Sequence, residues 1–535
     1  MPESATHTLL DGVIAAYLET LSEVEFFDAF AAVLRANGFY DIHRTHGTGE
    51  FGRDFIAKRL EDGVIYQYGI QTKVGDIGLA GWRDVRNQIE DIRLMTNVNP
   101  NFDQGLARKA VLATTGRLVG QAPTGADDYR QQFAADLAFE VWPIEHLIEM
   151  MVDAPESGLA GELEVPLIGA IAAIHLGTFR EHQLDQLSLS WIGQGVADLP
   201  RTALAALVIA ERLARSDRRD LACLVGPHLV RSTWATVHSV EPPPPEALAA
   251  ADVGKAILVR HARALLEEYA TVPEGSTAFL DATIDPGAVL TYPVRCLRLL
   301  EIFGLAGLAE EGEIRTVFTD ACERVVRELP GASHPPSDNW AVAIIPAAIL
   351  LSEQDPDLVG RWLRQLCVWL ADHYEQGKVG LARPLAPPDE EVRHLLCGPL
   401  DFIEVARRSE SFLASVLLDL ASALELGAAY DDIFNDVTAV DAYPQVVECD
   451  DDMTQYRDQY PGVYLELWMC YDESTDTRRG WACAPHHRRW EPHYLDRIER
   501  YWDSLALFAV LRDRCMPGVI REVAGLPIND SDEVA

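Results

Sequence analysis

The spacing of apolar residues changes near residue 160, and this change limits the architectures open to the chain. Before it, the pattern predicts helix, three strands, helix, strand, helix, strand and helix in that order. After it, long stretches with helical periodicity dominate, and a chain of 535 residues is too long for one ordinary core. We therefore expect an α/β domain over residues 1–155, a helical linker or first helical lobe over 156–240, and a mainly helical region over 247–535.

A predicted hairpin in the α/β part brings polar side chains together. The strands expected over residues 53–60 and 64–74 flank Asp62-Gly63, a pair typical of a two-residue type I′ turn. The register of such a turn places Asp54 opposite Gln71, and Lys73 projects on the same face because side chains alternate along a strand. The prediction depends on the turn, since a shift of one residue would move each side chain to the other face.

This cluster has two interpretations. A carboxylate and an amide carbonyl are hard oxygen ligands that suit Mg²⁺, and the lysine could stabilise negative charge on a phosphate or orient an attacking water. The simpler alternative is a salt bridge between Asp54 and Lys73 on a solvated sheet face. The spacing alone leaves both open.

The preceding segment, HGTGEFGRD over residues 46–54, has glycines spaced as in a dinucleotide-binding turn. That fingerprint requires a helix that begins within the glycines. Here a strand is expected to follow them. We interpret Gly47, Gly49 and Gly52 as joints between two strands.

From Leu21 to about Met151 the chain resembles the Mrr-like branch of the PD-(D/E)xK restriction-endonuclease superfamily. The matching pieces are an acidic helix ending in Gly38-Phe39, the glycine turn with Asp54, the motif IQTK (70–73), the strand VLATTG (111–116) and the late EVWPIEHLIEMM (140–151). The resemblance implies a restriction-endonuclease-like fold, with a mixed central sheet flanked by helices.

The resemblance also implies roles for single residues. Asp54 would bind Mg²⁺ or Mn²⁺, Gln71 would be a neutral ligand in a place often held by Glu, and Lys73 would be the catalytic lysine. The helix should add one more carboxylate. We favour Glu25 over Asp28, and Glu23 is a weaker third choice.

Four further polar residues near this site are candidates for substrate binding: Lys58, Arg83, Arg86 and Gln88. The basic ones could contact phosphates. Because the protein is acidic, an ordinary surface ion pair is the simpler role for each of these basic residues.

The net charge of −38 argues against non-specific nucleic-acid binding by the whole surface. Residues 1–152 contain 13 Lys and Arg against 22 Asp and Glu, a net charge of −9, so the remainder carries −29. Scattered cysteines without a C-x-x-C motif, and the absence of a signal-peptide or membrane-span pattern, lead us to expect a cytoplasmic protein.

The resemblance therefore predicts a metal-dependent endodeoxyribonuclease acting on DNA. Its attachment to a large acidic helical region suggests a restriction or anti-phage defence effector. Its helical region would sense a trigger, bind a protein partner or another copy of the chain, or hold the nuclease inactive. The alternative is an inactive nuclease-like fold that serves as a nucleic-acid-binding or assembly scaffold. A third possibility places the function in the helical region, as a receptor for a nucleotide or a protein.

Overall fold

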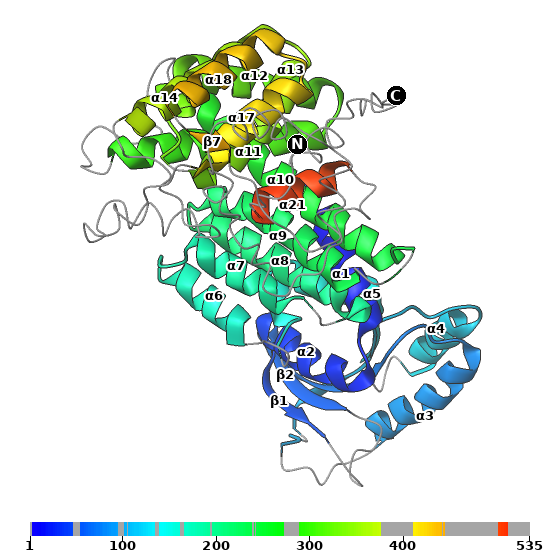
Figure 1. The fold of residues 1–535 in the computed structure, drawn as a ribbon. Coiled ribbons are helices and arrows are strands. Elements are labelled where there is room, and N and C mark those ends of the chain that lie inside the picture. The colour runs from blue at the N-terminus through cyan, green and yellow to red at the C-terminus, as the bar shows by residue number, and fades with distance from the viewer. Residues whose placement is uncertain are drawn as a thin grey trace. The chain divides into compact units, whose positions relative to one another are not determined.

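The chain divides into two compact units in the computed structural model, Met1–Gly169 with Gly195–Ile209 and Ala170–Gln194 with Ala210–Ala535. The first contains a sheet, and the second is built mainly from helices (Figure 1). None of the described helices is long and apolar enough to cross a membrane. The structure describes residues 3–45, 54–94, 101–103, 105–133, 138–160, 165–192, 195–237, 240, 242–271, 288–336, 338–375, 410–440, 442–444 and 501–511.

The first unit is organised around a five-stranded mixed sheet with the strand order β1-β2-β3-β4-β5. β1, β2 and β3 pair antiparallel, whereas β3, β4 and β5 pair parallel. This sheet, followed by a largely helical region, confirms the expected fold class. The strands are β1 (Tyr40–Arg44), β2 (Phe55–Glu61), β3 (Val64–Lys73), β4 (Ala107–Thr114) and β5 (Ala138–Trp142).

Helices flank the sheet, and their order relative to the strands from α2 to α5 is the expected one. The sequence pattern did not indicate α1, whose Tyr17 hydroxyl donates a 2.7 Å hydrogen bond to the carbonyl of Gly158. The helices of this part are α1 (Glu3–Thr20), α2 (Glu23–Ala36), α3 (Leu79–Leu94), α4 (Ala122–Phe133), α5 (Ile144–Val152) and the short 3-10 helix η1 (Pro155–Ser157).

The two faces of the sheet are covered by different helices. On one face, Trp82 of α3 and Tyr129 of α4 pack in a cluster with Leu112 of β4. On the other face, the ring of Phe30 in α2 lies 5.6 Å from that of Phe55 in β2, measured between centroids. Burial on both faces explains why the central strands are so apolar. The glycines Gly47, Gly49 and Gly52 lie outside the described residues.

The second part of the chain is helical. The proline run at residues 242–245 lies between α9 and α10 and supplies Pro245 as the first residue of α10. The elements are α6 (Val165–His175), α7 (Glu181–Ser190), η2 (Val196–Asp198), α8 (Leu199–Arg215), α9 (Arg219–Val237), α10 (Pro245–Ala270), α11 (Ala288–Ala309), α12 (Gly312–Glu328), η4 (Pro330–Ser333), η5 (Asp338–Ala343), α13 (Ile345–Ser352), α14 (Pro356–Glu375), β6 (Glu410–Ser411), α17 (Phe412–Ala423), α18 (Gly427–Ala439), β7 (Tyr443–Pro444) and α21 (Tyr501–Leu511).

Two contacts within this helical part involve residues that are uncommon in helix interiors, a pair of glycines and a buried arginine. α9 and α10 approach so closely at Gly226 that a Cβ there would lie 2.2 Å from the carbonyl oxygen of Gly254. Arg298 of α11 is buried and pairs with Glu301 on its own helix and with Glu181 of α7, 2.6 Å from its Nη2. Glycine permits the first contact, and the paired carboxylates offset the cost of burying the arginine.

Candidate active site

The hairpin of β2 and β3 brings Asp54 and Gln71 together as its turn predicts. Asp62 and Gly63 have positive φ angles of 48° and 82°, as a type I′ turn requires. The observed ladder keeps the register of this turn up to Phe55, so Asp54, one residue earlier, lies opposite Gln71 at the end of β3. Nε2 of Gln71 donates a 2.7 Å hydrogen bond to Oδ2 of Asp54. The predicted register is confirmed.

Thr72, which the sequence analysis did not consider, fixes the Asp54 carboxylate. Its backbone N–H and its Oγ1 donate to Oδ2 of Asp54 at 2.7 and 2.8 Å. With the Gln71 amide, three donors therefore meet on Oδ2, whereas Oδ1 accepts no hydrogen bond from the described residues. Strand alternation gave no signal for Thr72, because it assigns this side chain to the opposite face.

Burial raises the pKa of the Asp54 carboxyl above its ordinary value. The hydrogen bonds from Thr72 and the nearby Lys73 ammonium oppose this rise, and the Glu23 carboxylate adds to it. A divalent cation beside Oδ1 would favour the ionised form, because its charge attracts the carboxylate. Asp54 thus has one oxygen held by the protein and one that no described residue occupies.

Lys73 pairs with a carboxylate of α2. Its Nζ lies 3.6 Å from Oε1 of Glu23, the first residue of that helix, and the two side chains are 32% and 55% exposed. The alternative of a direct salt bridge between Lys73 and Asp54 is not observed among the described residues. Asp54, Gln71, Lys73 and Glu23 therefore gather where β3 ends and β2 begins.

Glu25, the helix carboxylate favoured from the sequence, takes part in a capping box at the start of α2. Its Oε2 accepts a 2.7 Å hydrogen bond from the backbone N–H of Ser22, and Ser22 Oγ accepts one from the N–H of Glu25. Asp28 lies 3.6 Å from Nη1 of Arg44. The acid paired with Lys73 is therefore Glu23. The spacing Ser22-x-x-Glu25 is itself a capping-box signature, so the sequence contained this signal.

The predicted TTG segment, which begins with Thr114 at the end of β4, holds the end of β3 in place. The N–H of Thr115 donates to the carbonyl of Lys73 at 3.2 Å, and Oγ1 of Thr114 donates to the carbonyl of Gly75 at 2.7 Å. A Cβ on Gly116 would lie 2.3 Å from the carbonyl carbon of Gly75, so only glycine fits this approach. These contacts fix the backbone on which Lys73 is carried.

The four candidates for substrate binding have different surroundings. Lys58 forms a 2.6 Å ion pair with Asp41 of β1. Arg86 lies over the ring of Tyr129 at 5.6 Å, and Arg83 is exposed. Oε1 of Gln88 is buried and has no hydrogen-bond partner among the described residues.

The oxygen donors around Lys73 fit a hard cation. Mg²⁺ commonly takes one or two protein carboxylates and keeps several waters, so Asp54 and Glu23 meet its minimum requirement. Gln71 could add its amide oxygen. No three His, Cys, Asp or Glu side chains in the described part of the chain are grouped so that they could hold a metal. The donor set is thus compatible with Mg²⁺ or Mn²⁺ and lacks the ligands of a closed zinc site.

No protein-family model matches this chain, and no curated protein or solved structure is significantly similar to it. The fold defines a mixed α/β unit joined to a helical region, and the site is a carboxylate–amide–lysine cluster at one end of the sheet.

Proposed function

We propose that the N-terminal unit is a metal-dependent endonuclease of the PD-(D/E)xK class, with DNA as its substrate. One observation carries the proposal: Asp54 and Gln71 are hydrogen-bonded across the hairpin, and Lys73 lies at the same strand end beside a helix carboxylate. The mixed five-stranded sheet is consistent with this class but also occurs in others, so the side chains carry the argument.

The chemistry follows from the positions of the side chains. A bound Mg²⁺ would polarise the phosphate and lower the pKa of a coordinated water. Asp54 would hold the cation through its open Oδ1, while Thr72 and Gln71 keep Oδ2 in place. The Lys73 ammonium would orient the attacking water and stabilise the negative charge that develops on the phosphate. Glu23 holds the ammonium near the strand end.

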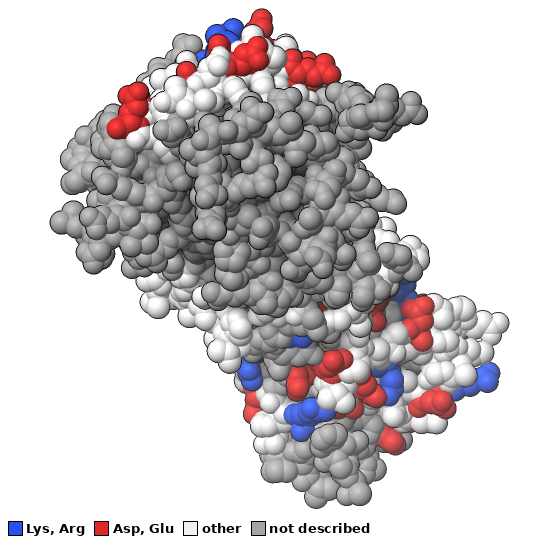
Figure 2. All heavy atoms as spheres, viewed as in Figure 1, with Lys and Arg blue, Asp and Glu red and all other residues white. Residues whose placement is uncertain are grey.

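The surface around the sheet suits a local contact with nucleic acid better than an extended one. In Figure 2, the described lysine and arginine side chains on the lower, N-terminal part of the molecule lie among aspartate and glutamate. Exposed Arg83 remains a candidate phosphate contact, and Lys58 would first have to leave Asp41. Binding of this kind should weaken steeply as salt rises.

The role of the helical region in this proposal rests on architecture alone. A nuclease joined to a large acidic helical region suits a cytoplasmic restriction or anti-phage defence effector. In that setting the helical region senses a trigger, binds a protein partner or another copy of the chain, or holds the nuclease inactive. The negative charge of the helical region would repel DNA until binding of a partner changes the conformation of the protein.

Cleavage of supercoiled plasmid tests the enzyme proposal directly. The purified wild type with Mg²⁺ or Mn²⁺ should nick or linearise the plasmid, and EDTA should stop the reaction. Lys73→Ala should lower the rate about 100-fold or more, because it removes a charge placed at the reacting phosphate. Equal cleavage rates for the wild type and this variant would reject the proposal that the protein is an endonuclease.

An inactive scaffold is the second candidate, and one observation favours it. Lys73 already pairs with Glu23, and Oδ2 of Asp54 already has three donors, so both side chains are held in place without a cation, although Oδ1 has no donor among the described residues. Titration of Mn²⁺ followed by electron paramagnetic resonance separates the two candidates. A scaffold should bind nucleic acid without retaining Mn²⁺ at Asp54, whereas the enzyme should lose Mn²⁺ binding in Asp54→Ala.

A further inference from the structure

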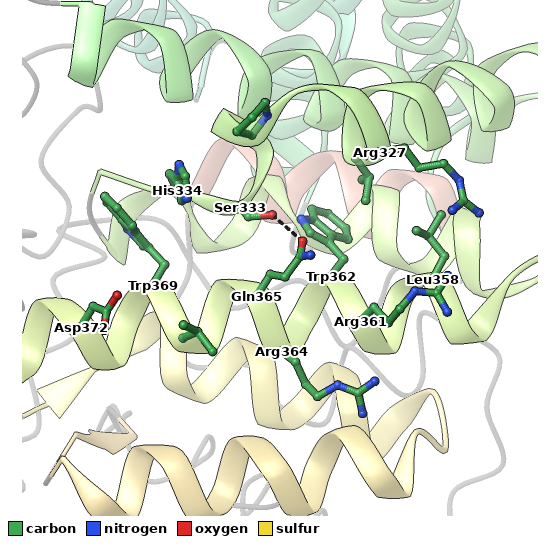
Figure 3. A pocket seen from close by; sticks show the side chains of 13 residues that line it. Arg327, Ser333, His334, Leu358, Arg361, Trp362, Arg364, Gln365, Trp369 and Asp372 are labelled. Carbon is green, nitrogen blue, oxygen red and sulfur yellow. Dashed lines mark hydrogen bonds between the residues drawn. The ribbon is translucent and has the colours of Figure 1, made fainter. Parts of the chain in front are cut away.

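A groove in the helical unit combines positive charge with fixed aromatic rings. It has a volume of about 840 Å³ and runs between α12 with η4 on one side and α14 on the other. This volume lies in the range of small-ligand sites. Figure 3 shows arginine side chains at one end and Trp369, His334 and Asp372 at the other.

One wall is a stripe along α14. Leu366 and Leu370 on the buried side of this helix are at most 2% exposed. Arg361, Gln365, Val368 and Asp372 follow one another at helical spacing and line the groove instead. Val368 is 53% exposed, so its apolar side chain is accessible in the groove. The stripe therefore presents a cation, an amide, an apolar surface and a carboxylate in sequence.

The aromatic end is rigid. Nε1 of Trp369 donates a 3.0 Å hydrogen bond to the carbonyl of Pro335, and its ring lies 4.4 Å from that of His334. The floor is held by Trp362, whose Nε1 donates to the carbonyl of Ala332 at 3.0 Å. A ring held in this way loses little freedom when a flat ligand packs against it.

The cationic end contains one arginine that is exposed and unpaired among the described residues. Arg327 is bound by Glu323 and Asp355, and Arg364 lies 3.2 Å from Asp432. Arg361 forms no ion pair or hydrogen bond with a described residue. In this groove, Arg361 therefore differs from Arg327 and Arg364, which are paired with carboxylates. With no partner among the described residues, its guanidinium can make a bidentate phosphate contact.

The spacing between the two ends indicates the size of a ligand. Arg361 and Trp369 are eight residues apart on α14, which places their Cα atoms about 12 Å apart along the helix axis. Between them, Oγ of Ser333 donates to Oε1 of Gln365 at 3.3 Å, which leaves the amide N–H groups of Gln365 for a ligand. A peptide carboxylate would satisfy Arg361, but it would leave the flat rings and the amide unused.

We propose that this groove binds a nucleotide, with the base against Trp369, its polar edge near Gln365 and the phosphates at Arg361. Free nucleotides and the phosphorylated end of a nucleic-acid strand share this chemistry. The site would lie in the helical unit and does not depend on the nuclease proposal. It would give the helical region a ligand of its own.

Isothermal titration calorimetry of the full chain in EDTA tests the groove without cleavage. The ligands are ATP, GTP, CTP and UTP, a 5′-phosphorylated single-stranded oligonucleotide, adenosine and inorganic phosphate. We expect at least one nucleoside triphosphate or the oligonucleotide to bind. Tighter binding of a triphosphate would identify a free nucleotide as the ligand, and tighter binding of the oligonucleotide would identify a strand end. Adenosine and inorganic phosphate alone should bind at least about tenfold more weakly, because each lacks one of the two contacts.

Variants then locate the binding. Arg361→Gln and Trp369→Leu should each weaken it about tenfold or more, and Trp369→Phe should retain most of it because a ring is kept. Arg315→Gln is the matched control, since it removes the same charge from α12 outside the groove. Circular dichroism confirms that each variant is folded. No binding by the wild type, or binding that Arg361→Gln leaves unchanged, would overturn the proposal, and equal binding of inorganic phosphate would reduce the groove to a simple anion site.

Discussion

The side-chain amide of Gln71 donates a 2.7 Å hydrogen bond to Oδ2 of Asp54, across the open end of the β2–β3 hairpin. Asp54 and Gln71 lie one position beyond Phe55 and Ile70, the last paired residues at the open end of the β2–β3 ladder. It leaves Oδ1 of Asp54 without a hydrogen bond from the described residues, and it turns the amide nitrogen of Gln71 towards the carboxylate.

Removing the Thr72 hydroxyl should loosen Asp54 without changing the shape of the core. Thr72 is fully buried, and Thr72→Val keeps its volume while deleting the 2.8 Å hydrogen bond to Oδ2. We expect a loss of about 1 kcal/mol in the free energy of unfolding. We also expect Mg²⁺ to bind about tenfold more weakly, as when a group that orients a metal ligand is removed.

Thr114→Val is the control for this variant. It also deletes a buried hydroxyl, but one that donates to the carbonyl of Gly75 and not to Asp54. Calorimetric titration with Mg²⁺ should show weaker binding in Thr72→Val only. Equal Mg²⁺ affinities in the two variants would mean that Thr72 has no special relation to the carboxylate.

The stability of the apoprotein should depend on pH through Asp54. Burial raises its folded-state pKa above the unfolded value near 3.8, so between the two pKa values the folded state binds more protons. The wild type should therefore lose stability relative to Asp54→Asn as pH rises from about 4 through the raised pKa, and no further above it. Urea unfolding of both proteins in EDTA at several pH values measures this difference. Parallel pH profiles would contradict the assigned direction.

The two acids at the start of α2 should respond differently to neutralisation. Glu23→Gln removes the charge that pairs with Lys73, whereas Glu25→Gln keeps the capping box because glutamine can also accept from the Ser22 N–H. If the endonuclease proposal is right, Glu23→Gln should lower Mg²⁺-dependent plasmid cleavage about tenfold or more. Glu25→Gln should stay close to the wild type. A larger loss in Glu25→Gln would restore Glu25 as the helix ligand.

The close approach of α9 and α10 should make Gly226 intolerant of any side chain. A Cβ there would lie 2.2 Å from the backbone oxygen of Gly254, so the helices must move apart. Gly226→Ala should cost about 1–3 kcal/mol of stability. Gly169→Ala in α6, where nothing lies within 4 Å of the added Cβ, should instead stabilise by roughly 0.5–1 kcal/mol. Thermal unfolding should shift in opposite directions for these two variants.

Local interactions explain what could be predicted of the site. The Asp62-Gly63 turn fixes the hairpin register, because the turn geometry and the strand twist are set by neighbouring residues. That register alone brings Asp54 opposite Gln71. The alternation of short strands and helices likewise followed from apolar spacing. The capping box of Ser22 and Glu25 also depends on residues close together in the chain, but the prediction of Glu25 as a metal ligand did not take it into account.

The sequence by itself determined the order of the elements from α2 to α5, the hairpin register and the helical character of the second part, since each depends on residues close together in the chain. Only the tertiary structure decided that Glu23 pairs with Lys73, that Thr72 donates to Asp54 and that Arg361 and Trp369 line one groove. Neighbouring positions on a helix point about 100° apart, so which acid reaches a strand depends on how the helix is rotated in its packing. That rotation is set by contacts such as Phe30 against Phe55, between residues far apart in sequence.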